Sequence, residues 1–459
     1  MKSKRWIGVL LCMLLCVGML PTMAFAAENY NILIGGFWVT SDNADDVLSD
    51  GGSVIYDKES NTVTLNNATL SSNIYCNTGS ALNIAVNGTN TMTCSDNVST
   101  GISNFGNYPI NISGSGSLTI TVAINKGHAI RGSDVTIDGI TLELYTSGTA
   151  LSGYPLMLKN GAKVTAKLSE GSDSIAVNGS IIEISDSTLT ATSPLGNSIL
   201  GDSIKIENST VTGTGYYPIM SDSGDMTIIN STVKAESTAD WGIWSRSNLL
   251  IKGNSDITAM GSIAALGAAN SFTLEPSTGE LIDVFVGADK DNAAAIDHSP
   301  LSQETDLSTY GNNSIKYFHS TPHKHTYDQQ IVSDEYKVND ATCTESAKYY
   351  QSCVCGAKGT ETFEEGTAAD HKAGTEWKSD GTNHWNECVN CGEKMNEAVH
   401  DFKWVTDKEA TATEAGSRHE KCEVCGYEKA AVEIPATGTT TEPTTPTEPT
   451  KPTDPTDTT

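Results

Sequence analysis

The fold of this 459-residue chain is decided by the stretch Ile206-Glu207-Asn208-Ser209-Thr210-Val211-Thr212, because copies of it return along the sequence. The apolar residue that anchors each copy follows the previous one after 19 residues (Leu65 to Ile84) to 28 residues (Ile84 to Ile112). Repeats of near-constant length in this range are typical of solenoids, in which each repeat is one turn. The anchors are Leu65, Ile84, Ile112, Ile137, Leu158, Ile184, Ile206, Ile228, Ile251 and Leu274.

Each repeat contains short stretches in which apolar and polar residues alternate, as in β-strands with one buried face. Between two such strands stands Asn, Asp or Gly, which tolerate the left-handed backbone angles of a tight corner. We expect the corner Asn side chains to hydrogen-bond to their equivalents in neighbouring turns. A third short strand, such as Gly242-Ile243-Trp244, precedes each anchor. Three strands per turn predict an all-β, right-handed parallel β-helix over residues 27–300.

Stacking must supply the stability of this β-helix, because no single turn can bury its own inward Ile, Leu and Val side chains. The alternative fold is a β-sandwich built from similar short strands. A sandwich gives no reason for one phrase to return at a near-constant spacing, so the pattern favours the β-helix.

The first 26 residues have the layout of a secretory signal peptide that is cleaved on export. Lys2, Lys4 and Arg5 precede an apolar run, residues 6–20, and Ala24-Phe25-Ala26 supplies small residues for cleavage. No later segment is long and apolar enough to span a bilayer. We therefore expect a secreted or cell-surface protein that is not inserted in the membrane after cleavage.

The formal net charge of −28 disfavours two classes of partner. Nucleic acids and anionic membrane surfaces are both bound through a basic face. An acidic polysaccharide would need a bridging cation, for example calcium held by Asp side chains of the β-helix. The plainer interpretation is that the charge keeps an exported monomer in solution.

Aromatic residues gather at the third corner of the repeats, where neighbouring turns would place them in a row. Flat rings suit the faces of sugars, so we predict that these residues bind carbohydrate. The alternative is that they cover the apolar column or cap a corner. The candidates are Phe105, Tyr108, Tyr154, Tyr216, Tyr217, Trp241 and Trp244.

Catalysis is the alternative to binding, because many parallel β-helices cleave polysaccharides with carboxylates and a base. The best cluster is Arg131 and His128 beside Asp134 and Asp138. Asp is also common at corners because it tolerates turns. We therefore assign no catalytic residue and keep a polysaccharide lyase or glycoside hydrolase as the alternative function.

Two cysteines of the β-helix, Cys76 and Cys94, lie about one turn apart. Stacked in neighbouring turns, they could form a disulfide in an exported protein. Two buried free thiols are the alternative.

A recurrent opening is recognisable in residues 29–65. Its residues are Tyr30, Ile34-Gly35-Gly36, Val39-Thr40-Ser41, Asn43-Ala44, Asp46-Val47-Leu48, Asp50-Gly51, Tyr56-Asp57 and Asn61 to Asn66. This opening resembles that of exported surface proteins of Gram-positive, Clostridia-type bacteria, in which β-helical repeats follow. That group is described as carbohydrate-binding, so the resemblance, which covers residues 28–274, implies a binding role without naming a sugar.

Beyond a linker, residues 301–321, three modules rich in Cys and His follow: 322–365, 366–398 and 399–434. Cys-x-x-Cys-Gly forms the tight knuckle of zinc-ribbon-like sites, and His residues would complete a closed tetrahedral structural zinc site. Disulfides and the absence of any metal are the alternatives. The predicted ligands are His325, Cys343, Cys353 and Cys355 in the first module, His371, His384, Cys388 and Cys391 in the second, and His400, His419, Cys422 and Cys425 in the third.

The modules resemble Cys/His-rich repeats near the ends of large Gram-positive surface proteins, which implies a stalk. Trp377 and Trp385 in the second module, and Phe402 and Trp404 in the third, are expected to help form a small core. The last segment, residues 435–459, is rich in Thr and Pro and predicts a disordered, extended cell-wall spacer.

The sequence as a whole predicts a non-catalytic extracellular protein that binds polysaccharide or another extended surface polymer. Besides the enzyme, the second alternative is an adhesin that binds protein. Fold alone does not choose between them, because function depends on sites placed on the fold.

Overall fold

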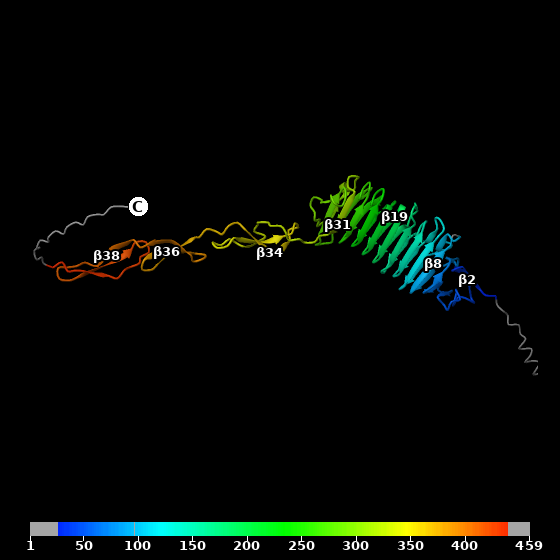
Figure 1. Cartoon of the computed structure of the whole chain (residues 1–459), viewed down its shortest axis with the longest axis horizontal. Coiled ribbons are helices and arrows are strands. Elements are labelled where there is room, and N and C mark those ends of the chain that lie inside the picture. Colours follow the sequence, from blue (N-terminus) through cyan, green and yellow to red (C-terminus); the bar gives the residue numbers. More distant parts are fainter. Residues whose placement is uncertain (1–25, 96, 439–459) are drawn as a thin grey trace, which may run out of the picture. The chain divides into compact units, whose positions relative to one another are not determined.

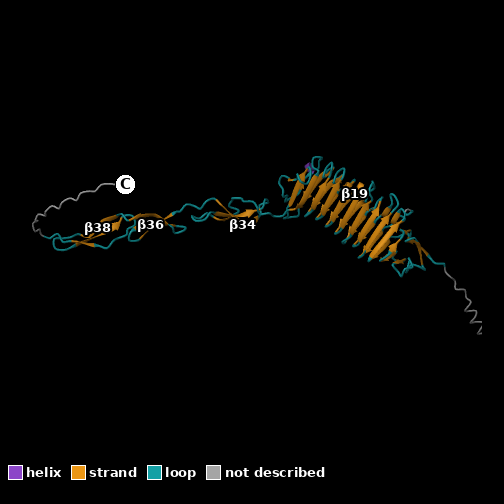
Figure 2. Cartoon of the chain, in the orientation of Figure 1, coloured by secondary structure: helices purple, strands orange, loops and turns teal. Residues whose placement is uncertain are grey.

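The computed structural model describes residues 26–95 and 97–438. They fall into two compact units that divide after Lys324 (Figure 1). Of the predicted signal peptide only Ala26 is described, and the Thr/Pro tail from residue 439 lies outside the described residues. Strands form almost all of the regular structure (Figure 2), and a short 3-10 turn, η1 (Ser308–Tyr310), is the one helical element among the described residues.

The first unit is a parallel β-helix of about nine turns, as the repeats predict. Each turn contributes one strand to each of three faces, and each strand pairs in parallel with the strands of the turns before and after it. The first face consists of β4 (Thr62–Asn66), β7 (Leu82–Asn87), β10 (Ile110–Gly114), β13 (Val135–Asp138), β16 (Leu156–Lys159), the second half of β18 (Val177–Ser185), the end of β19 (Thr188–Glu207), β21 (Met226–Ile229), β24 (Asn248–Lys252) and β27 (Ser271–Glu275).

The other two faces follow the same order, and the long strands β18, β19 and β20 each run around a corner from one face to the next. The second face consists of β5 (Thr69–Leu70), β8 (Thr89–Cys94), β11 (Ser117–Val122), β14 (Thr141–Thr146), β17 (Lys163–Leu168), the starts of β19 and β20 (Thr210–Ser221), β22 (Thr232–Ser237) and β25 (Asp256–Met260). The third face consists of β6 (Ile74–Cys76), β9 (Thr100–Asn104), β12 (His128–Arg131), β15 (Leu151–Gly153), the start of β18, the middle of β19, the end of β20, β23 (Ile243–Ser245) and β26 (Leu266–Ala268).

The predicted anchors stack in register from Ile84 to Leu274, each opposite the next. Leu65 is the exception, because Ile84 pairs with Val63 and Leu65 pairs with Val86. All these side chains are buried in one apolar core that runs the length of the β-helix. Burying such side chains contributes about 1.5–3 kcal/mol each, so the stacked rows supply the main stabilisation.

The corner between the first and second faces is built as the sequence predicts. Its Asn and Asp residues adopt positive φ angles, including 54° at Asn67, 47° at Asp186 and 49° at Asn208. Where a Gly takes the place of Asn, as at Gly88, any Cβ would lie 2.1 Å from Asn67 Oδ1 of the preceding turn. Only Gly fits there, because a side chain would clash with the stacked corner.

The expected hydrogen bonds between corner side chains of neighbouring turns form in part, because Asn87 Nδ2 donates to Asn66 Oδ1 (3.0 Å) and Asn160 Nδ2 donates to Asp138 Oδ1 (2.9 Å). From Ser187 to Ser255 a ladder of serines takes their place. The backbone N–H of Ser187 donates to Ser209 Oγ (3.1 Å), that of Ser209 to Ser231 Oγ (3.1 Å), and that of Ser231 to Ser255 Oγ (3.3 Å). All four serines are buried. The Asn one position earlier instead supplies the left-handed corner, and Asn67 Oδ1 accepts the backbone N–H of Thr89 in the next turn (3.0 Å).

Antiparallel strands cover both ends of the β-helix. At the N-terminal end, β1 (Asn29–Ile34) pairs with β2 (Phe37–Thr40) and β6, and β3 (Val54–Asp57) pairs with β4. At the other end, β31 (Tyr317–Pro322) pairs with β25 and β28 (Ile282–Gly287), β30 (Thr305–Asp306) pairs with β27, and β29 (Ala294–Ala295) pairs with β28. Covered ends prevent edge-to-edge association of open strands. Residues 301–321, predicted as a linker, therefore belong to this cap.

The second unit consists of three separate antiparallel hairpin sheets. The first hairpin sheet has strands β32 (Lys337–Asn339), β33 (Ala347–Ser352) and β34 (Lys358–Glu365). The second has β35 (Ala373–Ser379), β36 (Asn383–Cys388) and β37 (Lys394–Val399), and the third has β38 (Phe402–Lys408), β39 (Gly416–Cys422) and β40 (Val432–Ile434).

The serine ladder gives the first testable prediction. The substitution Ser209→Ala removes Ser209 Oγ, which accepts the hydrogen bond of the Ser187 N–H. A buried donor left without an acceptor costs about 1–3 kcal/mol. We expect a loss of stability of that size in the full chain, measured by chemical denaturation followed by circular dichroism. Ser223→Ala, at an exposed loop serine, is the matched control. Equal stability of the two variants would show that the ladder does not stabilise the corner.

Candidate functional sites

The outward side chains of the third face form one row. Strand register places Arg131 opposite Ser103 and Ser152, and Trp244 opposite Met220 and Gly267. Most of the residues beside them in each strand are buried, so the row faces outward, although its members Ser152, Met220 and Gly267 are themselves largely covered. From one end to the other the row is Tyr75, Ser103, Arg131, Ser152, Asn178, Leu200, Met220, Trp244 and Gly267.

A hollow of about 600 Å³, the first hollow, surrounds Arg131. Phe105, which is 61% exposed, lies at its edge with its ring centroid 6.4 Å from that of Tyr75. Tyr154 also contributes to the lining, and its hydroxyl accepts a hydrogen bond from Asn178 Nδ2 (2.6 Å), which fixes the ring. The other lining residues are Thr100, Ser103, Asn104, Gly106, Asn107, Gly132 and Ser133.

Asn104 lines the first hollow, but its amide oxygen is shielded from solvent. Its Nδ2 donates to the carbonyl oxygens of Ser80 (2.9 Å) and Pro109 (3.0 Å), which fixes the orientation of the amide. Its Oδ1 is buried and has no hydrogen-bond partner among the described residues. A buried polar atom without a partner is costly, so a water at this atom would be stabilised.

A second hollow, of about 390 Å³, lies on the same face around Trp244. The rings of Trp241 and Trp244 lie with centroids 4.4 Å apart. The Tyr217 hydroxyl donates to Asp240 Oδ2 (2.8 Å), and burial, followed by this bond, raises the pKa of Tyr217 to about 12. Arg246 also lines this hollow, and its Nε lies 3.1 Å from Asp222 Oδ1. Met220 and Ala269 complete the lining.

Five of the seven predicted aromatic residues therefore line one of the two hollows. Tyr216 packs against Tyr217 (ring centroids 5.0 Å) without lining the second hollow, and Tyr108 lies next to Gly106 outside the lining of the first. Sequence reasoning missed several lining residues because it followed aromatic residues at one corner, whereas the row depends on strand register. The missed residues are Tyr75, Asn104, Met220 and Arg246.

The four residues considered for catalysis do not form one site. Arg131 lines the first hollow, whereas Asp138 lies at the far end of β13, where it contacts Lys159 (3.5 Å) and accepts a bond from Asn160 (2.9 Å). His128 is half-buried, and burial, followed by the nearby Arg131, lowers its pKa. Neither hollow has an Asp or Glu in its lining.

Cys76 and Cys94 do not form a disulfide. Both are buried free thiols, and they lie on different faces of the β-helix. Cys76 ends β6 on the third face and pairs with Asn104, whereas Cys94 ends β8 on the second face and pairs with Val122. The 18 residues that separate them are less than one full turn of this part of the chain, so the two thiols do not stack.

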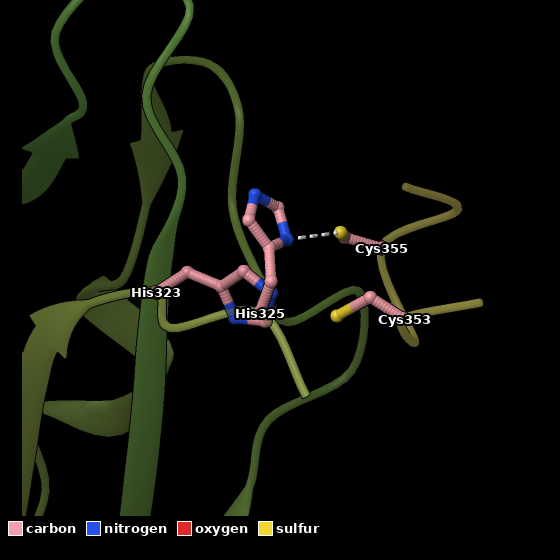
Figure 3. Close-up of side chains that lie close together, drawn as sticks. All are labelled: His323, His325, Cys353 and Cys355. Carbon is pink, nitrogen blue, oxygen red and sulfur yellow. Dashed lines mark hydrogen bonds between the residues drawn. The ribbon is translucent and has the colours of Figure 1, made fainter. Parts of the chain in front are cut away.

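The cysteines and histidines of the C-terminal region form three groups that could hold a metal ion, with ligand atoms in each group all within 4.8 Å of one another. Figure 3 shows the first Cys/His group, in which Cys355 Sγ lies 3.2 Å from His325 Nδ1. The first group is His323, His325, Cys353 and Cys355; the second is Cys343, His371, Cys388 and Cys391; the third is His384, His400, Cys422 and Cys425.

These groups differ from the predicted modules at four residues. His323, which was not among the predicted ligands, belongs to the first group. Cys343 belongs to the second group and not the first, and His384 belongs to the third and not the second. His419 joins no group; its Nδ1 lies 2.7 Å from Asp407 Oδ1 and its Nε2 3.6 Å from Glu428 Oε1. Sequence spacing alone missed this exchange, because a ligand can come from any strand that the fold brings near.

The distances between ligand atoms fit a tetrahedral ion. Zinc–sulfur bonds of about 2.3 Å and zinc–nitrogen bonds of about 2.0–2.1 Å separate two tetrahedral sulfurs by about 3.8 Å, and a sulfur from a nitrogen by about 3.6 Å. The sulfurs of Cys343 and Cys388 lie 3.7 Å apart. Sulfur and imidazole nitrogen lie 3.3 Å apart for Cys391 and His371, and 3.4 Å for Cys425 and His400. The described cysteines form no disulfide, so none of these contacts is a disulfide.

In two histidines of these groups, the ring nitrogen Nε2, which is not the atom nearest the cysteine sulfur, also has an oxygen partner. His400 Nε2 donates to the carbonyl oxygen of Asp380 (2.8 Å), and His371 Nε2 lies 3.0 Å from Glu393 Oε2. Metal-binding histidines usually donate their second N–H to such an oxygen, which orients the ring. Both rings therefore present Nδ1 to the centre of their group.

The lowered pKa values of two thiols, Cys388 and Cys422, also favour the binding of a cation. Backbone N–H groups of Asn390 and Cys391 lower the pKa of Cys388 to about 5. At Cys422 burial acts to raise the thiol pKa. Hydrogen bonds from the Cys425 N–H and from His400 outweigh burial and lower the pKa to about 6. Cys343 is the opposite case, because a hydrogen bond to Cys391 and burial raise its pKa to about 12, so an ion would have to displace the proton of this thiol.

The second and third hairpin sheets have almost no apolar core. Between residues 366 and 438 the buried side chains are Cys388, Cys422, His384, His400 and Asn386, and four of these five belong to a Cys/His group. The expected small core is wrong for Trp377 and Trp404, which are 38% and 50% exposed, whereas Trp385 and Phe402 are half-buried.

No protein-family model, curated protein or solved structure matches the chain. Among the described residues, no helix is long and apolar enough to cross a lipid bilayer.

The free thiols of the β-helix give a second prediction. We expect Cys76 and Cys94 to resist alkylation in the folded protein, because both are buried and burial raises the pKa of Cys94 to about 11. Both should react after denaturation without any reductant, as peptide mass spectrometry would measure. A linked Cys76–Cys94 peptide in the unreduced protein would contradict this assignment.

Proposed function

We propose that the third face of the β-helix binds an extended carbohydrate chain outside the cell, without cleaving it. The observation that carries this proposal is that two hollows, each with aromatic rings and one arginine, lie on the same outward row of side chains. Binding sites commonly combine apolar rings with a few polar groups in fixed positions.

The chemistry of each hollow suits a sugar. Exposed rings such as Phe105 can cover the flat, apolar side of a sugar ring, and exposed apolar surface of this kind is typical of binding sites. Arg131 is exposed and could donate hydrogen bonds to sugar hydroxyls. The held rings of Tyr154 and Tyr217 lose little conformational freedom on binding.

The spacing of the hollows favours a chain over a small sugar. Arg131 and Trp244 lie five strand spacings apart on the third face. At about 4.8 Å per strand this is about 24 Å. An extended polymer can contact both hollows at once and gain affinity from their linkage, which a monosaccharide cannot.

The absence of carboxylates from both linings supports binding without cleavage. Hydrolysis of glycosidic bonds usually needs two carboxylates on either side of the bond. The same linings offer no carboxylate pair for calcium, so we expect binding to be independent of this ion. The signal-like N-terminus and the Thr/Pro tail support a role at the cell surface.

The third prediction tests both hollows. We expect Trp244→Ala and Arg131→Ala each to weaken binding of a long polysaccharide roughly fivefold or more, since a buried contact at a binding centre contributes at least about 1 kcal/mol. The double variant should lose almost all binding. Calorimetry or affinity electrophoresis with a panel of polysaccharides and short oligosaccharides would measure this.

Trp404→Ala is the matched control, because Trp404 is also 50% exposed but lies on β38 in the second unit. It should bind like the unmodified protein. No binding to any glycan, or equal losses in Trp244→Ala and Trp404→Ala, would contradict the proposal. New reducing ends or unsaturated products would show that the protein is an enzyme.

We further propose that each Cys/His group holds one structural zinc ion. The group distances, the lack of disulfides among the described cysteines, and the oxygen partners of His371 and His400 support this assignment. With four protein ligands per group no coordination position stays open, as in structural and not catalytic zinc sites. Because the second and third hairpin sheets have almost no other core, zinc binding would supply their folding energy.

The fourth prediction is that the full chain purifies with three zinc ions, and that a strong zinc chelator unfolds residues 366–438 while the β-helix stays folded. Hydrogen exchange with mass spectrometry would locate the unfolding, because stable regions exchange slowly. The same chelator saturated with zinc beforehand is the control. Unchanged exchange after complete zinc removal would contradict the structural role.

A further inference from the structure

We infer that the metal ions of the second and third groups are joints between successive hairpin sheets, because each group takes a ligand from the preceding sheet. This inference rests on the proposed zinc binding and goes beyond it. A self-contained zinc module stabilises only itself, whereas a shared ligand couples the folding of one sheet to the position of the next.

The joint between the first and second hairpin sheets depends on Cys343. This residue lies in the loop between β32 and β33 of the first hairpin sheet. Its Sγ is 3.7 Å from Sγ of Cys388, which ends β36 in the second sheet. Cys391, in the turn after β36, and His371, just before β35, complete the group. Three ligands therefore come from one sheet and its leading segment, and one comes from the sheet before.

The joint between the second and third hairpin sheets depends on His384 in the same way. His384 lies in β36 of the second sheet, and its Nδ1 is 3.7 Å from Sγ of Cys422, which ends β39 in the third. Cys425 follows in the next turn, and His400 lies between β37 and β38. His384 is buried, so its ring is part of the joint and not a surface side chain.

Little else connects the first two sheets. No strand of one hairpin sheet pairs with a strand of another among the described residues. The connecting segment, residues 366–370, is exposed throughout, and one backbone bond, from Ala369 N–H to Thr342 O (2.8 Å), joins it to the loop of Cys343. Without the ion, this segment would behave as a flexible linker, so metal loading would set how firmly the sheets are held together.

Pairs of substitutions in the full chain can test which residues share an ion. Under the inference, Cys343→Ala with Cys391→Ala removes two ligands from one site, so two zinc ions stay bound with unchanged affinity. Cys343→Ala with Cys355→Ala removes one ligand from each of two sites, so only one ion keeps its affinity. If Cys343 instead completes the first site, these two results are exchanged. Competition with a chromophoric chelator counts the ions in each affinity class.

The third group offers an independent pair. His384→Ala with Cys425→Ala should spare two ions, and His384→Ala with Cys391→Ala should spare one. Exchanged results in both sets would overturn the inference while leaving zinc binding intact. If the unmodified chain binds no zinc, the proposed zinc function itself fails, which is a different result.

Hydrogen exchange gives a readout of the joint itself. The Ala369 amide should exchange faster in Cys343→Ala, because the loop that accepts its hydrogen bond is released. His325→Ala, which removes a ligand only from the first group, should leave this amide as protected as in the unmodified chain. Equal exchange in the two variants would overturn the role of Cys343 as a joint.

Discussion

In-register stacking of parallel strands is the constraint on which the β-helix and its candidate binding face depend. Each inward Ile, Leu or Val is buried only because the same position in the turns above and below is apolar. The stacking also makes an insertion costly within a strand but tolerable at a corner, which explains why turn length varies while the anchors from Ile84 to Leu274 stay paired. The position of every outward residue on the third face, the candidate binding face, is fixed by the same register.

The hairpin sheets of the second unit follow a different principle. They are small, and the second and third sheets expose Trp377 and Trp404 while the side chains that they bury are mostly thiols and imidazoles. Short domains of this kind commonly need a metal or disulfides to fold. Because the described cysteines form no disulfide, a bound ion is the stabiliser that fits, and exchanged ligands such as Cys343 would make it a connector as well.

The sequence was sufficient for features that repeat locally. The Ile-x-Asn-Ser-Thr-Val phrase predicted strands, corners and the solenoid, and the aromatic residues near the third corner predicted five residues of the two hollows. It was insufficient where a partner lies in another turn or sheet. Arg246, Asn104 and the serine ladder depend on register between turns, Cys76 and Cys94 depend on which face each reaches, and the partners of Cys343 and His384 depend on how hairpin sheets meet.

The most direct test of the central claim is a hydrogen-exchange footprint of the full chain with and without a saturating bound polysaccharide. If the third face binds the polymer, protection should appear both in residues 100–106, at the first hollow, and in residues 241–246, at the second, with the first and second faces unchanged. Protection confined to another face, or to the second unit, would contradict the account.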